Sequence, residues 1–536
     1  MNKALLMLAM LAFFASCANY KLNIAKEIDD PIPDLPAGQK ITHTLYLLGD
    51  GGNSKAGKVA PAVRFLGEQL KTADENSTVI FMGDNIYPGG FPGKKDPGRA
   101  LAEHRLEVQL DILKGFKGKA WMIPGNHDWR SGLKRLKKEE DFLEEYAETQ
   151  GDLPFEWIPD DGCSGPEVVE VNDNLVIIFI DSEWWLMDWN KEPELNEGCE
   201  IKSKENFLYF FEEAMKKYRN KNIVIAMHHP LYSNGPHGGR FTFSQHIFPL
   251  TQVNPKLYIP LPGIGTIFSF LRMTVGSRQD IAHPELHELR KGLEASAKKN
   301  GQFIFVSGHE HNLQLFEKDS QVYLISGSGS KISPAGRGND AVLTYGHVGH
   351  SVIKFFDDGS AWAEFWVPEG DGTTGRLIFR KKIKGPLPAL TADPPQSFPE
   401  YESNQSAFAR RLDPSPRKGR LHRIIWGEHY REAYRAEVTA PKFDLETFRG
   451  GMTPIKRGGG YQTNSLRLLD ADGHQWVMRD MLKDATRIVP YPFNQTIAKD
   501  VFADQFTSAH PYAAFVIAPM AASVHIYHTN PKLFYV

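Results

Sequence analysis

Five short polar motifs each follow an apolar run, and they constrain the fold of this 536-residue chain more than any other feature. The motifs are GDGG at 49–52, GDNIY at 83–87, GNHD at 125–128, HHP at 228–230 and GHEH at 308–311. The runs before them, TLYLL, STVIFM, KAWMIP, NIVIAM and QFIFVS, are typical of buried strands. Because parallel strands present functional residues in loops at their carboxyl ends, we expect the five motifs to meet at one place.

Strand-like and helical patterns alternate from Ile41 to about Lys384, which predicts one layered α/β domain over 41–384. Helical patterns cover 59–71, 99–113, 136–148, 204–218 and 284–298. Three later runs, QVYLISGSGS, HSVIKFFD and AWAEFWV, have no helical pattern between them. We therefore expect them to be antiparallel strands that close a sheet.

The segment 239–280 interrupts this alternation, because it is apolar, contains several prolines and glycines, and lacks a clear period. A loop of this length inside a compact domain is usually functional. We favour a lid over the active site. A surface for a membrane or a partner, and a packed loop with a small core of its own, are the alternatives.

The first 17 residues predict export. Asn2 and Lys3 precede an apolar run at 4–15 that is too short to span a bilayer, and small residues lie directly before Cys17. This resembles a bacterial lipoprotein signal with Cys17 as the lipidated residue, so we expect an anchored protein of the cell envelope, periplasmic or in the outer membrane. An ordinary cleaved secretion signal is the alternative. The polar, proline-containing residues 18–40 predict a tether.

Two further cysteines flank the strand-like run NLVIIFID, Cys163 before it and Cys199 after it. In an oxidising compartment they can pair and close a loop. Two unpaired buried thiols are the alternative.

The C-terminal part of the chain is separate by composition. Residues 385–420 are dense in proline, serine and charge and predict a linker, and 421–536 predict a smaller mixed α/β module of unknown role that contacts another domain or protein. Within this module GGGYQTNSLRLLDADGHQWVMRD predicts a β-hairpin rather than a phosphate-binding loop. The apolar ending VHIYHTNPKLFYV is typical of a truncated domain. The net charge of -3 and the lack of a long basic run argue against nucleic acid as a main partner.

The residue types in the five motifs are those of metal ligands. Carboxylates, an amide, imidazoles and a phenol together suit iron, manganese or zinc rather than calcium or a thiolate-bound structural zinc. Seven ligands are too many for one tetrahedral ion, and they suit two ions that share a bridging carboxylate. The candidates are Asp50, Asp84, Tyr87, Asn126, His228, His309 and His311.

The order of the motifs resembles the purple acid phosphatase branch of the calcineurin-like metallophosphoesterases, and most closely its small, tartrate-resistant type. The family pattern runs GDxG, GDNxY, GNHD, GHYP and GHDHNLQ, and the last two motifs here read MHHP and GHEHNLQ. The resemblance covers about 45–330 and is specific at the motifs but thin between them. It implies a four-layer αββα sandwich.

The resemblance also implies which residue binds which ion. Asp50, Tyr87 and His311 would bind Fe(III), and Asp84 would bridge to the second ion. Asn126, His228 and His309 would bind that second, divalent ion, which is Fe(II), Zn(II) or Mn(II). A ligand role for His229 instead of His228 is the less favoured alternative.

The implied reaction is hydrolysis of phosphomonoesters by attack of a metal-bound hydroxide. His127 and His237 would bind the phosphate oxygens and protonate the leaving alkoxide, since histidine titrates near the working pH. The alternative for His237 is a solvated loop residue. A phosphodiesterase of the same superfamily is the nearest rival function, and a surface-anchored binding or scaffold protein with a residual metal site is the other.

The chain departs from the family after its first aspartate. The family often has GDWG, whereas Gly51 and Gly52 follow Asp50 here, and we expect this to alter the rim of the pocket. Trp129, Trp184 and Trp185 are either replacement aromatic walls or core residues.

Overall fold

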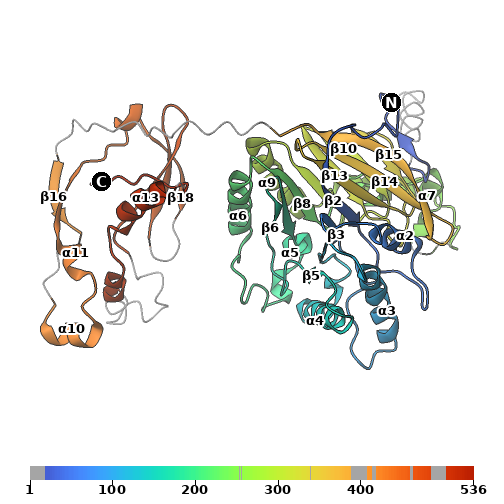
Figure 1. Cartoon of the computed structure of the whole chain (residues 1–536), viewed down its shortest axis with the longest axis horizontal. Helices are drawn as coiled ribbons and strands as arrows, with labels where there is room; N and C mark the ends of the chain where they lie inside the picture. Colours follow the sequence, from blue (N-terminus) through green and yellow to red (C-terminus); the bar gives the residue numbers. More distant parts are fainter. Residues whose placement is uncertain are drawn as a thin grey trace. The chain divides into compact units, whose positions relative to one another are not determined.

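The computed structural model describes residues 18–252, 254, 256–338, 340–387, 407–412, 418–458, 463–483, 503–524 and 526–536. Its backbone divides into two compact units, 1–390 and 391–536 (Figure 1). The predicted signal, with Cys17, and most of the predicted linker lie outside the described residues. None of the described helices has the length and apolar character that a membrane span requires.

Two stacked β-sheets form the centre of the first unit (Figure 1). The eight-stranded sheet contains, in spatial order, β1 (Asn23–Ile24), β12 (Ala341–Tyr345), β10 (Leu313–Lys318), β11 (Gln321–Ser326), β9 (Ile304–Ser307), β8 (Asn222–Met227), β7 (Leu175–Ile180) and β6 (Glu167–Asn172). The seven-stranded sheet contains β15 (Thr374–Lys384), β14 (Ala361–Glu369), β13 (His350–Phe356), β2 (Ile41–Leu48), β3 (Ser77–Phe81), β4 (Lys119–Met122) and β5 (Phe155–Trp157).

Helices cover the outer faces of both sheets. α2 (Pro61–Leu70), α3 (Arg99–Leu110) and α4 (Leu133–Thr149) lie on the seven-stranded side, and α5 (Ser182–Leu186), α6 (Lys204–Lys217) and α9 (Pro284–Asn300) on the other (Figure 1). Alternate strand residues such as Leu45, Ile80, Val224 and Val306 fill the space between the sheets. The opposite faces of the strands pack against the helices in a second core. The four-layer αββα prediction is therefore confirmed.

The apolar runs before the five motifs all form strands, divided between the sheets. β2, β3 and β4 pair in parallel in one sheet, and β8 and β9 pair in parallel in the other. The later strands differ from the prediction. β13 and β14 are antiparallel in the seven-stranded sheet, but β11 pairs with β9 and β10 in the eight-stranded sheet. The tight turn between β10 and β11 keeps these two strands in one sheet.

Residues 18–40 and 239–280, which composition alone predicts to be a tether and a loop, both contain regular secondary structure. In the region expected to be a tether, β1 extends the eight-stranded sheet by pairing with β12, because Ile24 and Ile28 pack against the core between the sheets. Segment 239–280 folds into α7 (Phe243–Ile247), the 3-10 turn Pro249–Gln252 and α8 (Ile264–Thr274).

Cys163 and Cys199 form a disulfide, so the predicted pairing is confirmed.

The second unit contains two small antiparallel sheets and short helices. The strands are β16 (Ala407–Arg411) with β17 (Glu437–Pro441), and β18 (Thr453–Gly458) with β19 (Ser465–Leu469) and β20 (Gln475–Arg479). The helices include α10 (Arg420–Trp426), α11 (Arg431–Arg435) and α13 (Ala513–Ser523). β19 and β20 form the predicted hairpin. Phe448, Met452 and Leu468 make a small core beside it.

Candidate metal centre

The ends of β2, β3, β4, β8 and β9 bring all seven predicted ligands together. Asp50, Asp84 and His309 each have a positive φ, of 58°, 54° and 67°, directly after a strand. This backbone conformation is costly for residues other than glycine, and it is concentrated at functional sites. It turns each side chain out of the strand direction toward the neighbouring loops.

Close packing of glycine supports this geometry. A Cβ added to Gly125 would lie 2.3 Å from the backbone nitrogen of Asp84, and one added to Gly52 would lie 2.3 Å from the backbone nitrogen of Ile86. The motif loops therefore touch each other through their backbones. Gly51 and Gly52 are both buried: Gly52 packs against the backbone of Asn85 and Ile86, and Gly51 packs against the side chain of Gln109 in α3.

One group of oxygen and nitrogen atoms surrounds the phenol of Tyr87. Its hydroxyl donates to Asp50 Oδ1 at 2.7 Å or to Asp84 Oδ2 at 2.9 Å, and lies 3.1 Å from His311 Nε2. His311 Nε2 is also 3.4 Å from Asp50 Oδ1. These four side chains are those of the predicted first metal position with its bridging carboxylate.

A second group surrounds the amide oxygen of Asn126. This Oδ1 lies 3.1 Å from His228 Nε2 and 3.0 Å from His309 Nδ1. His228 Nε2 is 3.4 Å from the other oxygen of Asp84, Oδ1. The two oxygens of Asp84 thus face different groups, an arrangement that suits a bridging carboxylate.

The remaining ring nitrogens of these histidines have backbone partners. His228 Nδ1 lies 2.8 Å from the carbonyl oxygen of Met82, and His309 Nε2 lies 2.9 Å from that of Gln279. A carbonyl oxygen only accepts, so each nitrogen carries the proton, and the inward nitrogens keep free lone pairs. Outer hydrogen bonds of this kind orient metal-binding histidines.

His229 is held differently from His228. Its Nδ1 lies 2.8 Å from Ser182 Oγ and its Nε2 lies 2.6 Å from Gln279 Oε1, so both nitrogens have partners outside the seven predicted ligands. Its ligand atoms are nevertheless close enough to His228 and His309 to join them around a cation. The hydrogen bonds favour His228 as the ligand and His229 as a buried support.

Burial sets the charge states of the ligands. Burial and then the charge of Asp84 raise the pKa of Asp50 to about 7, because two buried carboxylates repel each other. Burial and the same carboxylates raise the pKa of Tyr87 well above its usual value. Burial, followed by the charge of Lys331, lowers the pKa of His311 to about 3, and burial lowers that of His309. Unprotonated imidazoles beside crowded carboxylates fit cations, which would relieve the repulsion and favour a phenolate.

The predicted catalytic histidines lie at the exposed side of this centre. The side chains of His127 and His237 are 22% and 25% exposed, whereas Asp84 and His228 are almost fully buried. His127 Nε2 lies 4.0 Å from Asp84 Oδ2, and the ring of His237 lies 4.0 Å from that of His309, centre to centre. Both rings can therefore contact a ligand bound at the centre.

Segment 239–280 ends at the centre. Asp280 Oδ1 lies 3.0 Å from His237 Nδ1, and the Asp280 carboxylate, which is fully buried, pairs with Arg272 of α8. Although burial opposes it, His237 and Arg272 lower the pKa of Asp280. His237 Nε2 has no hydrogen-bond partner among the described residues, so this nitrogen is available to a ligand.

Sequence reasoning missed four residues around the centre. They are Glu183, which accepts from Gln279, together with Gln279, Asp280 and Lys331. Lys331 Nζ lies 3.9 Å from the centre of the Tyr87 ring, beside the carboxylates of Asp50 and Asp84. A signal for Lys331 is its place directly after the GSGS turn that follows β11. Trp129, Trp184 and Trp185 are buried core residues rather than pocket walls.

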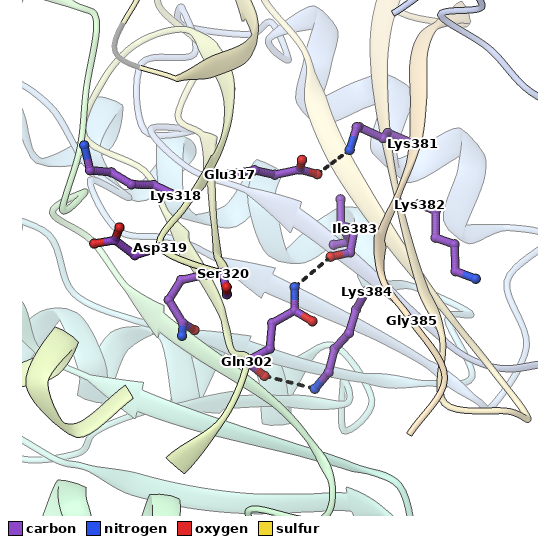
Figure 2. A pocket seen from close by; sticks show the side chains of 11 residues that line it. Gln302, Glu317, Lys318, Asp319, Ser320, Lys381, Lys382, Ile383, Lys384 and Gly385 are labelled. Carbon is purple, nitrogen blue, oxygen red and sulfur yellow. Dashed lines mark hydrogen bonds and ion pairs between the residues drawn. The ribbon is translucent and has the colours of Figure 1, made fainter. Parts of the chain in front are cut away.

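A surface hollow elsewhere on this unit is not the site. Figure 2 shows it between β10, β11 and β15, and none of the seven predicted ligands lines it. Two of its lysines have partners there: Lys381 pairs with Glu317, and Lys384 donates to the carbonyl oxygen of Gln302.

Comparisons with known proteins point to phosphoesterases. Residues 43–259 match the calcineurin-like phosphoesterase family model. Purple acid phosphatase 17 of Arabidopsis thaliana is 20% identical over 343 residues, which are 61% of this chain and 78% of that protein.

Two solved structures are also similar. One is GAP50, the anchor in the inner membrane complex of Plasmodium, with a TM-score of 0.39 and 15% identity over 64% of this chain and 89% of that one. The other is the purple acid phosphatase PPD1 from yellow lupin (Lupinus luteus) seeds, with a TM-score of 0.36 and 13% identity over 65% of this chain and 54% of that one. The first unit is therefore similar to metal-dependent phosphoester hydrolases of the calcineurin-like family, and the curated relative belongs to their purple acid phosphatase branch.

Proposed function

We propose that this chain is an exported phosphatase that hydrolyses phosphomonoesters at a centre of two metal ions. The observation that carries this proposal is the position of Asp84, whose two oxygens face two different groups of ligand atoms. A single carboxylate between two such groups is the arrangement that two-metal hydrolases use.

The ligands divide between the two positions by their chemistry. Asp50, Tyr87 and His311 supply anionic oxygens and one imidazole, which suit Fe(III). Asn126, His228 and His309 supply neutral donors, which suit Fe(II), Zn(II) or Mn(II). Bound ions of this kind neutralise phosphate charge and lower the pKa of water.

The protein residues at the mouth handle the phosphate. His127 is fixed by its Nδ1, which lies 2.5 Å from the carbonyl oxygen of Pro88 and therefore donates to it. Its Nε2 lies on the side of the centre, 4.0 Å from Asp84 Oδ2. His237 is fixed on its Nδ1 side by Asp280 and Arg272 and offers Nε2. In the imidazolium form, which carries a proton on Nε2 as well, one of them can donate to an equatorial oxygen while the other gives a proton to the leaving alkoxide.

The test of substrate class compares two chromogenic substrates that release the same phenol, a phosphomonoester and its diester. The proposal predicts a kcat/KM for the monoester at least about tenfold higher. The reverse preference would make the chain a phosphodiesterase. Failure to bind metal after growth with iron and zinc, with no turnover of either substrate, would support a binding or scaffold protein.

Export and lipidation are a separate part of the proposal. The disulfide between Cys163 and Cys199 supports an oxidising compartment. Mass spectrometry of the membrane fraction should find an N-terminal peptide that begins at an acylated Cys17. A mature chain that begins at a later, unmodified residue would show an ordinary secretion signal instead.

A further inference from the structure

The exposed face of α8 is apolar, which is the reverse of an ordinary surface helix. Ile267 and Phe270 are 60% and 55% exposed, whereas the residues that α8 buries are the small Gly265 and Ser269. The other exposed apolar residues of this face are Ile264, Phe268, Leu271 and Val275. A helix of a globular protein normally turns its apolar stripe to the core. A patch of this kind marks a contact with a partner or a membrane.

The chain that leads into α8 extends the patch. Leu257, Tyr258 and Ile259 are exposed in succession, and the ring of Tyr258 packs against that of Phe248 after α7. α8 contacts both α7 and the 3-10 turn after it, so the apolar residues belong to one folded segment. We call the exposed residues of 257–259 and α8 the apolar face.

The segment that carries the apolar face contains charges of one sign. Residues 241–279 contain no Asp or Glu, although the whole chain has 65 of them in 536 residues. The same segment contains Lys256, Arg272 and Arg278, of which Arg272 is paired with Asp280. Exposed apolar side chains with cationic neighbours fit the interface of a bilayer that contains anionic lipids.

The start of the described chain lies against the same segment. The backbone nitrogen of Ala18 donates to the carbonyl oxygen of Phe241 at 3.0 Å, and Ala18 is buried. The ring of Phe241 is 5.9 Å from that of Phe268, centre to centre. Ala18 directly follows the predicted lipid-bearing Cys17 in the sequence. An acyl anchor at Cys17 would therefore enter the membrane close to α8.

We propose that the apolar face lies in the lipid interface as a second membrane contact beside the anchor. With 11 residues, α8 is too short to span a bilayer, so it lies in the interface plane. This contact fixes the orientation of the unit, which an acyl anchor alone leaves free. The proposal rests on the exported, lipid-anchored part of the proposed function, but not on its phosphatase part.

The first test places a probe on the apolar face. In the full-length chain an Ile267→Cys variant is labelled with an environment-sensitive fluorophore and bound to vesicles of phosphatidylethanolamine and phosphatidylglycerol. The matched control carries the label at Tyr209→Cys, which replaces an exposed aromatic residue of α6. Mass spectrometry first verifies that Cys17 is acylated and that the label has reacted only at the new cysteine.

Brominated lipids should quench the probe at 267 and not the probe at 209. Equal, weak quenching at both positions would overturn the proposal. Without vesicles, the fluorescence of the probe at 267 should not depend on protein concentration. If it showed that water is increasingly excluded as the concentration rises, the proposal would also be overturned, because a second copy would then cover the face.

A second test removes the apolar character. The double variant Ile267→Glu with Phe270→Glu should lose at least about tenfold in quenching by brominated lipids, reported from a probe at Leu271→Cys. The control pair Tyr209→Glu with Phe210→Glu should leave this quenching unchanged. Both variants should hydrolyse a soluble phosphomonoester at the wild-type rate, so a failure of the phosphatase proposal appears as an inactive wild type. Unchanged quenching in the α8 variant would overturn the membrane contact.

Discussion

The two halves of the metal centre have different origins in the fold. The ligands come from the ends of strands that are paired on both sides and backed by two cores, and their loops touch through backbone atoms. The support for His237 and His309 comes instead from 239–280, a segment outside the sheets whose helices are short. The first half, the seven ligands, is held in place by the two sheets and their cores. The second half, segment 239–280, lies outside the sheets and orients two histidines that the sheets already position. Changes in the two halves should therefore have different consequences.

The largest effect is expected for a ligand of the first half. Asp84→Asn removes one charge from the carboxylate that faces both groups of ligands, so both ions should bind poorly and kcat/KM should fall by at least about 10³-fold. Metal analysis and phosphomonoester kinetics measure this together. Asp188→Asn, at the half-buried N-cap of the 3-10 turn Trp189–Lys191, is the control and should change neither, since Asn also caps well. A fully active Asp84→Asn protein would contradict the assignment of the centre.

A smaller effect is expected for the second half. Asp280→Asn removes the carboxylate on the Nδ1 side of His237, so we expect kcat to fall by about 10–100-fold while the metal content and KM stay close to wild type. Asp280→Glu should restore part of kcat, because it keeps the charge. Loss of metal in Asp280→Asn, or an equal loss in Asp280→Glu, would show a general structural role instead.

The close approach of the strand-end loops gives a paired prediction on stability. Gly52→Ala places a Cβ 2.3 Å from backbone atoms of Asn85 and Ile86, which cannot move easily, and should destabilise the first unit by about 1–3 kcal/mol. Gly51→Ala meets only the side chain of Gln109, whose amide oxygen makes no hydrogen bond among the described residues, so we expect a smaller loss of stability. Urea unfolding should therefore separate the two variants. Equal stabilities would mean that the loop contact is looser than the structure has it.

The sheets also carry a pH dependence of their own. His350 of β13 is buried with Nε2 2.6 Å from Gln69 Oε1, and burial lowers its pKa to about 3. The unfolded chain, with a histidine pKa of about 6.5, binds this proton first. The contribution of neutral His350 to the free energy of unfolding is therefore fully present above pH 6.5. It is lost progressively as the pH falls, by about 2 kcal/mol at pH 5.

This loss is measurable in the metal-free protein. Urea unfolding of wild type and His350→Gln at pH 7 and pH 5 should show a smaller acid loss in the variant, by about 2 kcal/mol. The same acid loss in both proteins would assign the pH dependence to other groups, such as the buried His43, whose pKa burial lowers to about 4.

The sequence predicted the first half of the centre because its signals are local. A buried strand followed by Asp, Asn or His is visible within ten residues, and the fold then brings five such places together. It did not predict Gln279 and Asp280, because they act through contacts with residues 30 and 43 positions away. Only the absence of acidic residues between Phe241 and Gln279 marks Asp280 as unusual.

The environment of the glycines and tryptophans next to the motifs was also not predictable from the motifs alone. Gly51 and Gly52 suggest a change of pocket rim when the motif alone is compared, yet Gly52 is buried against the backbone of the next motif and Gly51 against Gln109 of α3. Trp129 also follows a motif, but its indole nitrogen donates to Asp181 inside the core. Which way a side chain points after a strand depends on the loop beside it, and a single sequence does not contain that information.

The central claim is that one carboxylate joins two metal positions, one of which includes a phenolate. The most direct measurement is the metal content of the purified full-length protein together with its visible spectrum, compared with Tyr87→Phe. The account predicts two ions per chain in the wild type and a visible charge-transfer band that is lost in Tyr87→Phe. One ion per chain, or a band that Tyr87→Phe leaves unchanged, would contradict it.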